Sequence, residues 1–178
     1  RYFIKKVCNN RLFFRPRVMI CIPSGVTEVE ERAVRQAAEQ AGARKAFLME
    51  EPLAAALGAG LDISEPGGNM IVDIGGGTTD VAVLSLNGIV CSKSLRIGGD
   101  KFDEAIVRFA RKEHNLLIGE RFAEEIKMEV GTAYIEDLRE NRTIEVRGRN
   151  LITGLPNSVS FSAFDIYDAL QEPLEAIV

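Results

Sequence analysis

The first half of the chain alternates short unbroken apolar runs with stretches of helical period. Residues 18–22 and 44–49 are apolar runs bounded by turn residues, which predicts two buried strands. Between them, residues 29–41 carry apolar side chains at helical spacing, after a capping box of Thr27 and Glu30 and before Gly42. A further helix of small residues is predicted over 53–61, with Pro52 at its first position. Alternating strands and helices indicate an α/β fold.

The middle of the chain predicts an antiparallel meander. Strands are expected over 70–74, 81–86 and 89–95, and Asn87-Gly88 is a strong signal for a type I′ hairpin turn between the last two. The polar stretch 62–69, which contains one proline and two adjacent glycines, is the best candidate for a boundary between subdomains.

The last third of the chain predicts helices at 101–112, 119–130 and 165–178, and strands at 143–146 and 158–161. Asp100 is the expected cap of the first of these helices, and Ser162 that of the last.

Asp73 and the glycines after it are the first candidate for chemistry. A buried strand of Ile and Val has no packing reason to carry a carboxylate unless the charge meets a cation or a donor. Three consecutive glycines leave backbone N–H groups unobstructed and Thr78 adds a hydroxyl, so Gly75, Gly76, Gly77 and Thr78 are predicted to clamp a phosphate, with Asp73 facing its metal ion.

The two commonest glycine loops do not fit this stretch. No lysine follows the glycines, and residues 78–83 continue as a strand instead of opening a helix, which excludes both a Walker loop and a dinucleotide fingerprint. A glycine-rich turn without a ligand is the alternative, and it leaves Asp73 unexplained.

Two carboxylates, Glu50 and Glu51, precede Pro52 where a predicted strand meets a helix. Ligands of α/β sheets bind at that end of the strands. One carboxylate is expected to complement the helix dipole and the other to orient a water molecule.

Two weaker signals follow. Gly98 and Gly99 stand at a second strand-to-helix junction, where backbone donors are offered to an anion. Glu124, Lys127 and Met128 are grouped at helical spacing, for which a solvated face with paired charges is the alternative.

The loop at residues 9–16 has three large apolar residues, Leu12, Phe13 and Phe14, among arginines. Aromatic and basic residues together favour the headgroup region of a membrane. The alternative is that Leu12 and Phe13 join the core and the arginines are merely solvated.

Composition narrows the function classes. The chain has 178 residues, 46% of them hydrophobic and 27% charged, which suits a globular protein. Its net charge is −4, and residues 1–17 hold six basic residues and no acid, so the rest of the chain is strongly acidic and nucleic-acid binding is disfavoured. Three cysteines without metal spacing indicate free thiols in a reducing compartment, and one histidine supplies neither a triad nor a zinc site. No apolar run approaches the ~18 residues of a membrane span, so a cytoplasmic protein is expected.

Four motifs together carry a family resemblance. They are Glu-Glu-Pro-Leu-Ala-Ala-Ala (50–56), Asp-Ile-Gly-Gly-Gly-Thr-Thr-Asp (73–80), Ile-Gly-Gly-Asp-Lys-Phe-Asp (97–103) and Ala-Glu-Glu-Ile-Lys-Met-Glu (123–129). In this order and spacing they resemble the actin and heat-shock-chaperone ATPase superfamily, and within it the bacterial actin family of MreB and Mbl. The resemblance extends over essentially the whole chain.

The resemblance implies an actin-like ATPase (ribonuclease H-like) fold, ATP and Mg²⁺ as ligands, and a role for each motif. Gly75 to Thr78 match the second phosphate loop, and Asp73 the aspartate that holds Mg²⁺ through water. Glu51 matches the residue that orients the attacking water, with Thr78 helping to place it, and Glu124 and Lys127 the ribose-adenine contact. Gly98 and Gly99 lie near the nucleotide, and Leu12, Phe13 and Phe14 match a membrane-insertion loop.

The resemblance also implies a middle fragment, because the family's first phosphate loop and its later adenosine-side glycines are missing. Residues 1–68 are expected to be the second half of subdomain IA, 69–112 the start of IIA, and 113–178 subdomain IIB with the return into IIA. The full-length protein is expected to be a weak ATPase that forms filaments on the inner face of the membrane with cell-wall elongation proteins, and this chain alone is expected to be inactive.

Three other functions compete with this one. A chaperone-type ATPase of the same superfamily would lack lengthwise self-association, a sugar kinase would need an inserted sugar pocket that the sequence does not show, and an inert scaffold would bind no nucleotide.

Overall fold

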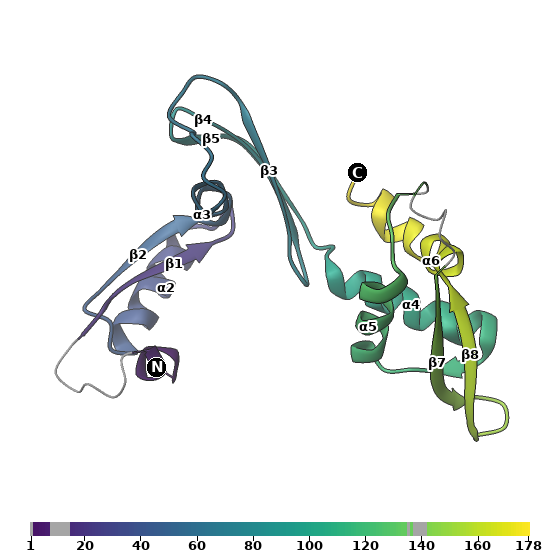
Figure 1. Ribbon diagram of the computed structural model, residues 1–178. Helices are drawn as coiled ribbons and strands as arrows, with labels where there is room; N and C mark the ends of the chain where they lie inside the picture. The colour runs from purple at the N-terminus through teal and green to yellow at the C-terminus, as the bar shows by residue number, and fades with distance from the viewer. Residues whose placement is uncertain (1, 8–14, 135, 137–141) are drawn as a thin grey trace. The chain divides into compact units, whose positions relative to one another are not determined.

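The computed structural model describes residues 2–7, 15–134, 136 and 142–178 (Figure 1). By their contacts they divide into two compact units. Unit 1 comprises residues 1–73 and 80–94, and unit 2 comprises residues 74–79 and 95–178. The chain therefore crosses between the units three times.

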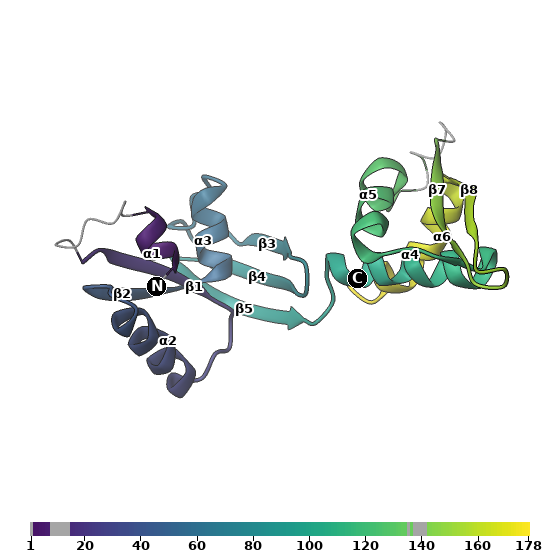
Figure 2. The same cartoon turned by 90° about the horizontal axis from the view of Figure 1, so that it is seen from below.

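Unit 1 begins with a short helix, α1 (Tyr2–Val7), and then forms a strand-helix-strand motif. Strands β1 (Arg17–Ile22) and β2 (Lys45–Glu50) pair in parallel, with Arg17 opposite Lys45 and Ile22 opposite Glu50. Helix α2 (Glu28–Gln40) makes the crossover, as parallel strands require, and the predicted capping box of Thr27 and Glu30 opens it (Figure 2).

The meander of unit 1 matches the prediction except at its turn. Strands β3 (Asn69–Ile74), β4 (Thr79–Ser85) and β5 (Gly88–Leu95) form one sheet in that order. The two residues with positive φ, as a type I′ turn requires, are Leu86 and Asn87, so the turn lies one residue earlier than the Asn-Gly pair predicts. The backbone N–H groups of Leu86 and Asn87 donate to the carbonyls of Glu65 and Ile63, and these tertiary bonds hold leucine in a conformation it rarely adopts.

Helix α3 (Glu51–Gly58) packs on this sheet. Its buried Ala56 joins Ala82 and Leu84 of β4, with Ile71 of β3 and Ile89 of β5 beside them. One face of the sheet therefore lines a hydrophobic core of unit 1. Met70, Val72 and Ile74 alternate onto the other face of β3 and are exposed, which corrects the expectation that β3 is a fully buried strand.

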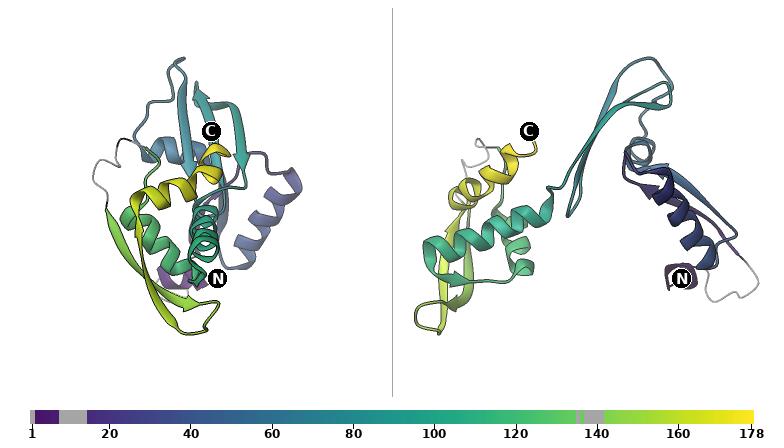
Figure 3. Two further views of the ribbon diagram at one scale, coloured as in Figure 1. Left: turned by 90° about the vertical axis from the view of Figure 1, so that its right-hand side faces the viewer. Right: turned by 180° about the vertical axis from the view of Figure 1, so that it is seen from behind.

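Unit 2 packs three helices against a small antiparallel sheet (Figure 3). The helices are α4 (Gly99–His114), α5 (Glu120–Val130) and α6 (Ala163–Glu175), and the strands are β6 (Leu116–Leu117), β7 (Thr143–Asn150) and β8 (Pro156–Ser162). β7 pairs with β8 from Thr143 opposite Ser162 to Arg149 opposite Pro156. The two-residue strand β6, which the sequence does not predict, pairs with the end of β7.

The core of unit 2 is contributed by every one of these helices and strands. Phe161 of β8 is completely buried, with its ring 5.2 Å from that of Phe109 and 5.0 Å from that of His114. His114, the last residue of α4, therefore stacks on the ring of Phe161 and packs against the core. The cap of α4 is Gly98 instead of the predicted Asp100, which lies in the first turn, whereas Ser162 caps α6 as predicted.

Candidate functional site: two glycine turns and an acidic strand end

The predicted phosphate loop, residues 75–78, is the tip of the β3–β4 hairpin and belongs to unit 2. The N–H of Gly75 donates to the carbonyl of Thr78 over 2.8 Å, which closes the loop. All four residues are exposed. The next residue, Thr79, is fully buried and its hydroxyl donates to the carbonyl of Ile97 over 2.7 Å. A side chain thus ties the loop to the segment that leads into α4.

The second glycine pair lies directly against this loop. The N–H groups of Gly99 and Asp100, the first two of helix α4, donate to the carbonyls of Gly75 and Gly76 over 2.9 and 2.8 Å. These two donors, which the sequence offers to an anion, are therefore engaged by the loop itself. Two carbonyl oxygens of the loop are turned toward α4 as a result.

Gly98 makes this close approach possible. A Cβ on Gly98 would lie 2.6 Å from the carbonyl oxygen of Gly76 and closer still to that of Gly75. The backbone of Gly98 is extended, with φ −162° and ψ −159°, so the conformation itself suits any residue. The requirement for glycine here is steric.

Lys127 reaches the same place from α5. Its ammonium lies 2.8 Å from Oδ1 of Asp103 and donates to the carbonyl of Gly99 over 3.3 Å. Asp103 is buried, and its Oδ1 has this ion pair but accepts no hydrogen bond of good geometry from the part of the chain that the structure describes. Glu124 is exposed on the same helix. The sequence grouped Lys127 with Glu124, whereas the fold pairs it with Asp103, a partner that helix periodicity within α5 cannot reveal.

A separate group of carboxylates belongs to unit 1. Glu50 ends β2 and makes no side-chain cap, and Glu51 is the first residue of α3 and is half-buried. Burial first, and then the charges of Asp80 and Asp73, raise the pKa of the Glu51 carboxyl above its ordinary value. The predicted Asp73 and Glu51 are thus close enough to interact, together with a third carboxylate that the sequence reasoning did not single out.

Asp80 is that third carboxylate. It is 4% exposed, whereas Asp73 is exposed, and its Oδ1 has no hydrogen-bond partner among the described residues. The unexplained buried charge is therefore Asp80, not Asp73. Alternation along β4, with buried Ala82 and Leu84 on the same face, is the signal that predicts its burial. An unpaired buried carboxylate oxygen costs free energy, and a bound cation would offset that cost.

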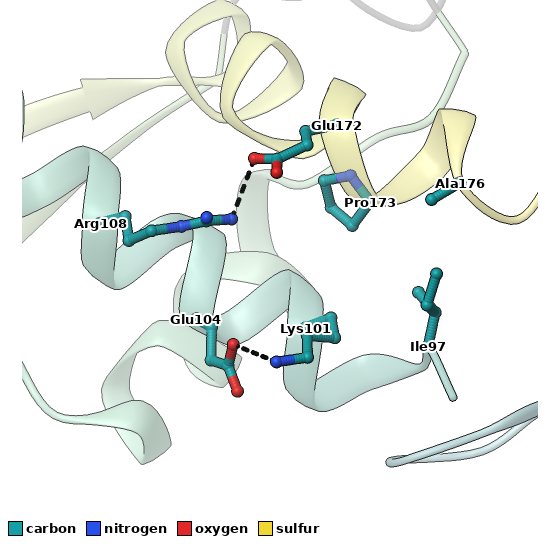
Figure 4. A pocket seen from close by; sticks show the side chains of 7 residues that line it. All are labelled: Ile97, Lys101, Glu104, Arg108, Glu172, Pro173 and Ala176. Carbon is teal, nitrogen blue, oxygen red and sulfur yellow. Dashed lines mark hydrogen bonds and ion pairs between the residues drawn. The ribbon is translucent and has the colours of Figure 1, made fainter. Parts of the chain in front are cut away.

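A separate pocket of about 300 Å³ lies between α4 and α6 (Figure 4). Its charged side chains neutralise one another: Lys101 lies 2.6 Å from Glu104, and Arg108 lies 3.1 Å from Glu172. Ile97, Pro173 and Ala176 supply its apolar walls. None of the predicted nucleotide-site residues lines this pocket.

Two other predictions concern the membrane: a membrane-binding loop, and the absence of a membrane-spanning segment. Leu12, Phe13 and Phe14, the predicted membrane loop, lie outside them. Within the described residues, no helix combines the length and apolarity that crossing a membrane needs.

Comparison with known proteins places the chain in a class. The fold is that of the actin-like ATPases. Two structures of MreB5 from Spiroplasma citri, at 35% sequence identity, superpose on 99% and 98% of the chain with TM-scores of 0.91 and 0.88, one bound to ADP and the other to AMPPNP. They are matched over 53% and 54% of their own lengths. The double helical filament structure of MamK, at 19% identity and a TM-score of 0.72 over 99% of this chain and 50% of its own, shares the fold.

The sequence comparison gives the family. The MreB/Mbl protein family matches residues 1–178, and the chain belongs to it. The cell shape-determining protein MreB of Escherichia coli (strain K12) is 57% identical over 180 residues, which is all of this chain and 51% of that protein. The chain thus spans about half the length of the curated relatives it matches. The resemblance inferred from the four motifs is confirmed.

Proposed function

We propose that the complete protein carrying this chain binds and hydrolyses MgATP, and that it forms membrane-associated filaments that direct cell-wall synthesis and rod shape. The observation that carries the nucleotide part is the glycine loop at residues 75–78. Its carbonyls at Gly75 and Gly76 accept bonds from the start of α4, while the loop itself stays exposed. Because those two carbonyl oxygens point toward α4, they would not repel an anion that binds to the glycine backbone on the exposed side of the loop. The nucleotides bound by MreB5 of S. citri support the same proposal.

The residue roles are those that the family resemblance implies. Gly75, Gly76, Gly77 and Thr78 hold the phosphates, and Gly98 and Gly99 support them. Lys127 and Glu124 contact the ribose and adenine. Glu51 orients the attacking water with the help of Thr78. The N–H groups of the phosphate loop stabilise the charge that develops on the phosphoryl oxygens, which accelerates phosphoryl transfer to water.

The carboxylates fit a magnesium ion. Asp80 offers a buried oxygen that accepts no hydrogen bond from any described residue, and the charges of Asp80 and Asp73, after burial, contribute to the raised pKa of Glu51. Magnesium is commonly held by one or two carboxylates, with water and phosphate oxygens completing its shell. Asp73 is the residue proposed to hold it through water, and the ion would neutralise charge on the phosphates.

A pair of adjacent carboxylates supplies the test. In the complete protein, Glu51→Ala is expected to lower single-turnover phosphate release by about 100-fold or more, because water positioning acts in the transition state. The affinity for a fluorescent ATP analogue should change by less than about threefold. Glu50→Ala is the matched control and should hydrolyse ATP like the wild type. Loss of binding as large as the loss of hydrolysis would contradict the role of Glu51.

Filament and membrane binding need separate measurements. Sedimentation of the complete protein with ATP, but not without nucleotide, is expected for a polymerising protein. Binding to anionic vesicles should fall when Leu12, Phe13 and Phe14 are all changed to serine, because apolar insertion and basic residues act together. Leu57→Ser, at an exposed apolar position of α3, controls for general loss of hydrophobicity. Equal vesicle binding by the triple variant and the wild type would refute the membrane loop.

A further inference from the structure

The Asp103–Lys127 ion pair joins two helices at the start of α4. Asp103 lies one turn into α4 and is buried, so its charge needs a partner, and the ammonium of Lys127 on α5 lies 2.8 Å away. Asp103 thereby restricts where the long lysine side chain can go. The same ammonium donates to the carbonyl of Gly99 over 3.3 Å.

Gly99 carries this constraint to the glycine loop. Its carbonyl accepts from Lys127, and its N–H donates to the carbonyl of Gly75 over 2.9 Å. The N–H of Asp100 repeats the bond to Gly76 over 2.8 Å. A continuous series of polar contacts therefore runs from Asp103 through Lys127 and Gly99 to the loop, entirely within unit 2.

We propose that Asp103 is a positioning residue of the nucleotide site, holding Lys127 against Gly99 and through it fixing the loop at residues 75–78. The inference rests on the proposed function. The new element is that Lys127, which is assigned to the ribose and adenine, also fixes the loop that binds the phosphates. The two ends of the nucleotide site are therefore connected by one series of contacts.

The arrangement has a consequence for catalysis. A lysine that only contacts the sugar and base stabilises the ground state and the transition state equally, so its loss weakens binding and leaves the chemical step unchanged. A lysine that also fixes the phosphate loop affects the chemical step, because a shift of about 1 Å in a positioning group costs up to about 100-fold in rate. The two possibilities are separable by experiment.

The test uses Asp103→Asn in the complete protein, which keeps the shape of the side chain and removes its charge. Hydrogen exchange without nucleotide should become about tenfold faster at the amides of Gly99 and Asp100, with residues 105–112 of α4 unaffected. At saturating MgATP, phosphate release should fall about tenfold or more, and the affinity for ADP should fall less. Glu104→Gln, next along α4 and in an exposed ion pair with Lys101, is the control and should match the wild type.

A second variant covers the possibility that Asp103→Asn does not fold. Lys127→Gln removes the other end of the ion pair and should give the same local exchange at Gly99 and Asp100. Where both single variants fold, the double variant should be no worse than the more impaired one, because both act through one series of contacts.

Three results would overturn the proposal: wild-type exchange at Gly99 and Asp100 in the variants, faster exchange spread evenly over α4 and α5, or local exchange with unchanged hydrolysis. Wild-type protein that binds no MgATP would instead refute the proposed function. In that case the exchange measurement, which needs no nucleotide, still decides whether Asp103 holds the loop.

Discussion

An alanine at position 98 would place one methyl group against the backbone of the glycine loop. The new Cβ would lie 2.6 Å from the carbonyl oxygen of Gly76 and closer still to that of Gly75, and ordinary contact begins at 3.4 Å, so the loop and the start of α4 must separate by at least about 0.8 Å. The extended backbone of Gly98 needs no change, which leaves this displacement as the whole effect.

The displacement has two measurable costs. Overpacking of this kind destabilises by about 1–3 kcal/mol, and weakening the bonds from Gly99 and Asp100 to the loop adds up to about 1 kcal/mol each. We therefore expect Gly98→Ala to lower the free energy of unfolding by about 2–4 kcal/mol in urea titrations. ATP hydrolysis should fall by about 100-fold, because the phosphate loop moves by nearly 1 Å.

The control is Gly67→Ala. Its new methyl group would have no atom within 4 Å, so its unfolding free energy should stay within about 0.5 kcal/mol of the wild type. Unchanged stability and unchanged hydrolysis in Gly98→Ala would refute the steric account of the two glycine turns.

Three further predictions concern stability, and the complete protein is measured without nucleotide or magnesium. The raised pKa of Glu51 means that folding favours its protonated form, so stability is lost as pH rises through the folded-state pKa; Glu51→Gln should therefore melt above the wild type at neutral pH, and the difference should vanish below the ordinary value of 4.5. A difference that is constant with pH would contradict this cause. Gly148→Ala should lower the free energy of unfolding in urea by about 1–3 kcal/mol, because its Cβ would lie 2.8 Å from Cγ of Leu116 and still closer to the carbonyl of Leu117. Wild-type stability would show that β6 moves aside without cost. Ser162→Ala should cost about 1 kcal/mol, because its hydroxyl accepts from the N–H of Asp165 at the start of α6, and no change in the unfolding midpoint would mean that the cap contributes nothing.

Local patterns predicted the elements well. Most strands and helices of both units occur where the apolar period places them, and the capping box at Thr27 and the cap at Ser162 are both present. The errors arise where a tertiary bond overrides a local preference. Leu86 takes a central position of the turn because the backbone of the turn donates hydrogen bonds to residues 63–65. Strand β6 forms because it pairs with the edge of β7.

The sequence singles out the motifs of the candidate site but not the contacts that they make. The glycines at 75–77, Asp73 and Glu51 stand out in the sequence because each breaks the pattern around it. Asp80 and Asp103 do not, although Asp80 is a buried carboxylate of unit 1 and Asp103 one of unit 2. The sequence does not show which carboxylates the fold will bury, and burial is what makes their charge costly.

The sequence by itself determined most of the strands and helices, which turns are rich in glycine, and which family the chain belongs to, because period, capping and motif spacing are local properties. Only the tertiary structure decided that the second glycine pair packs against the first, and that Lys127 forms an ion pair with Asp103 on another helix. Those contacts join residues that are distant along the chain, and their energies depend on burial and on distances of a few ångströms.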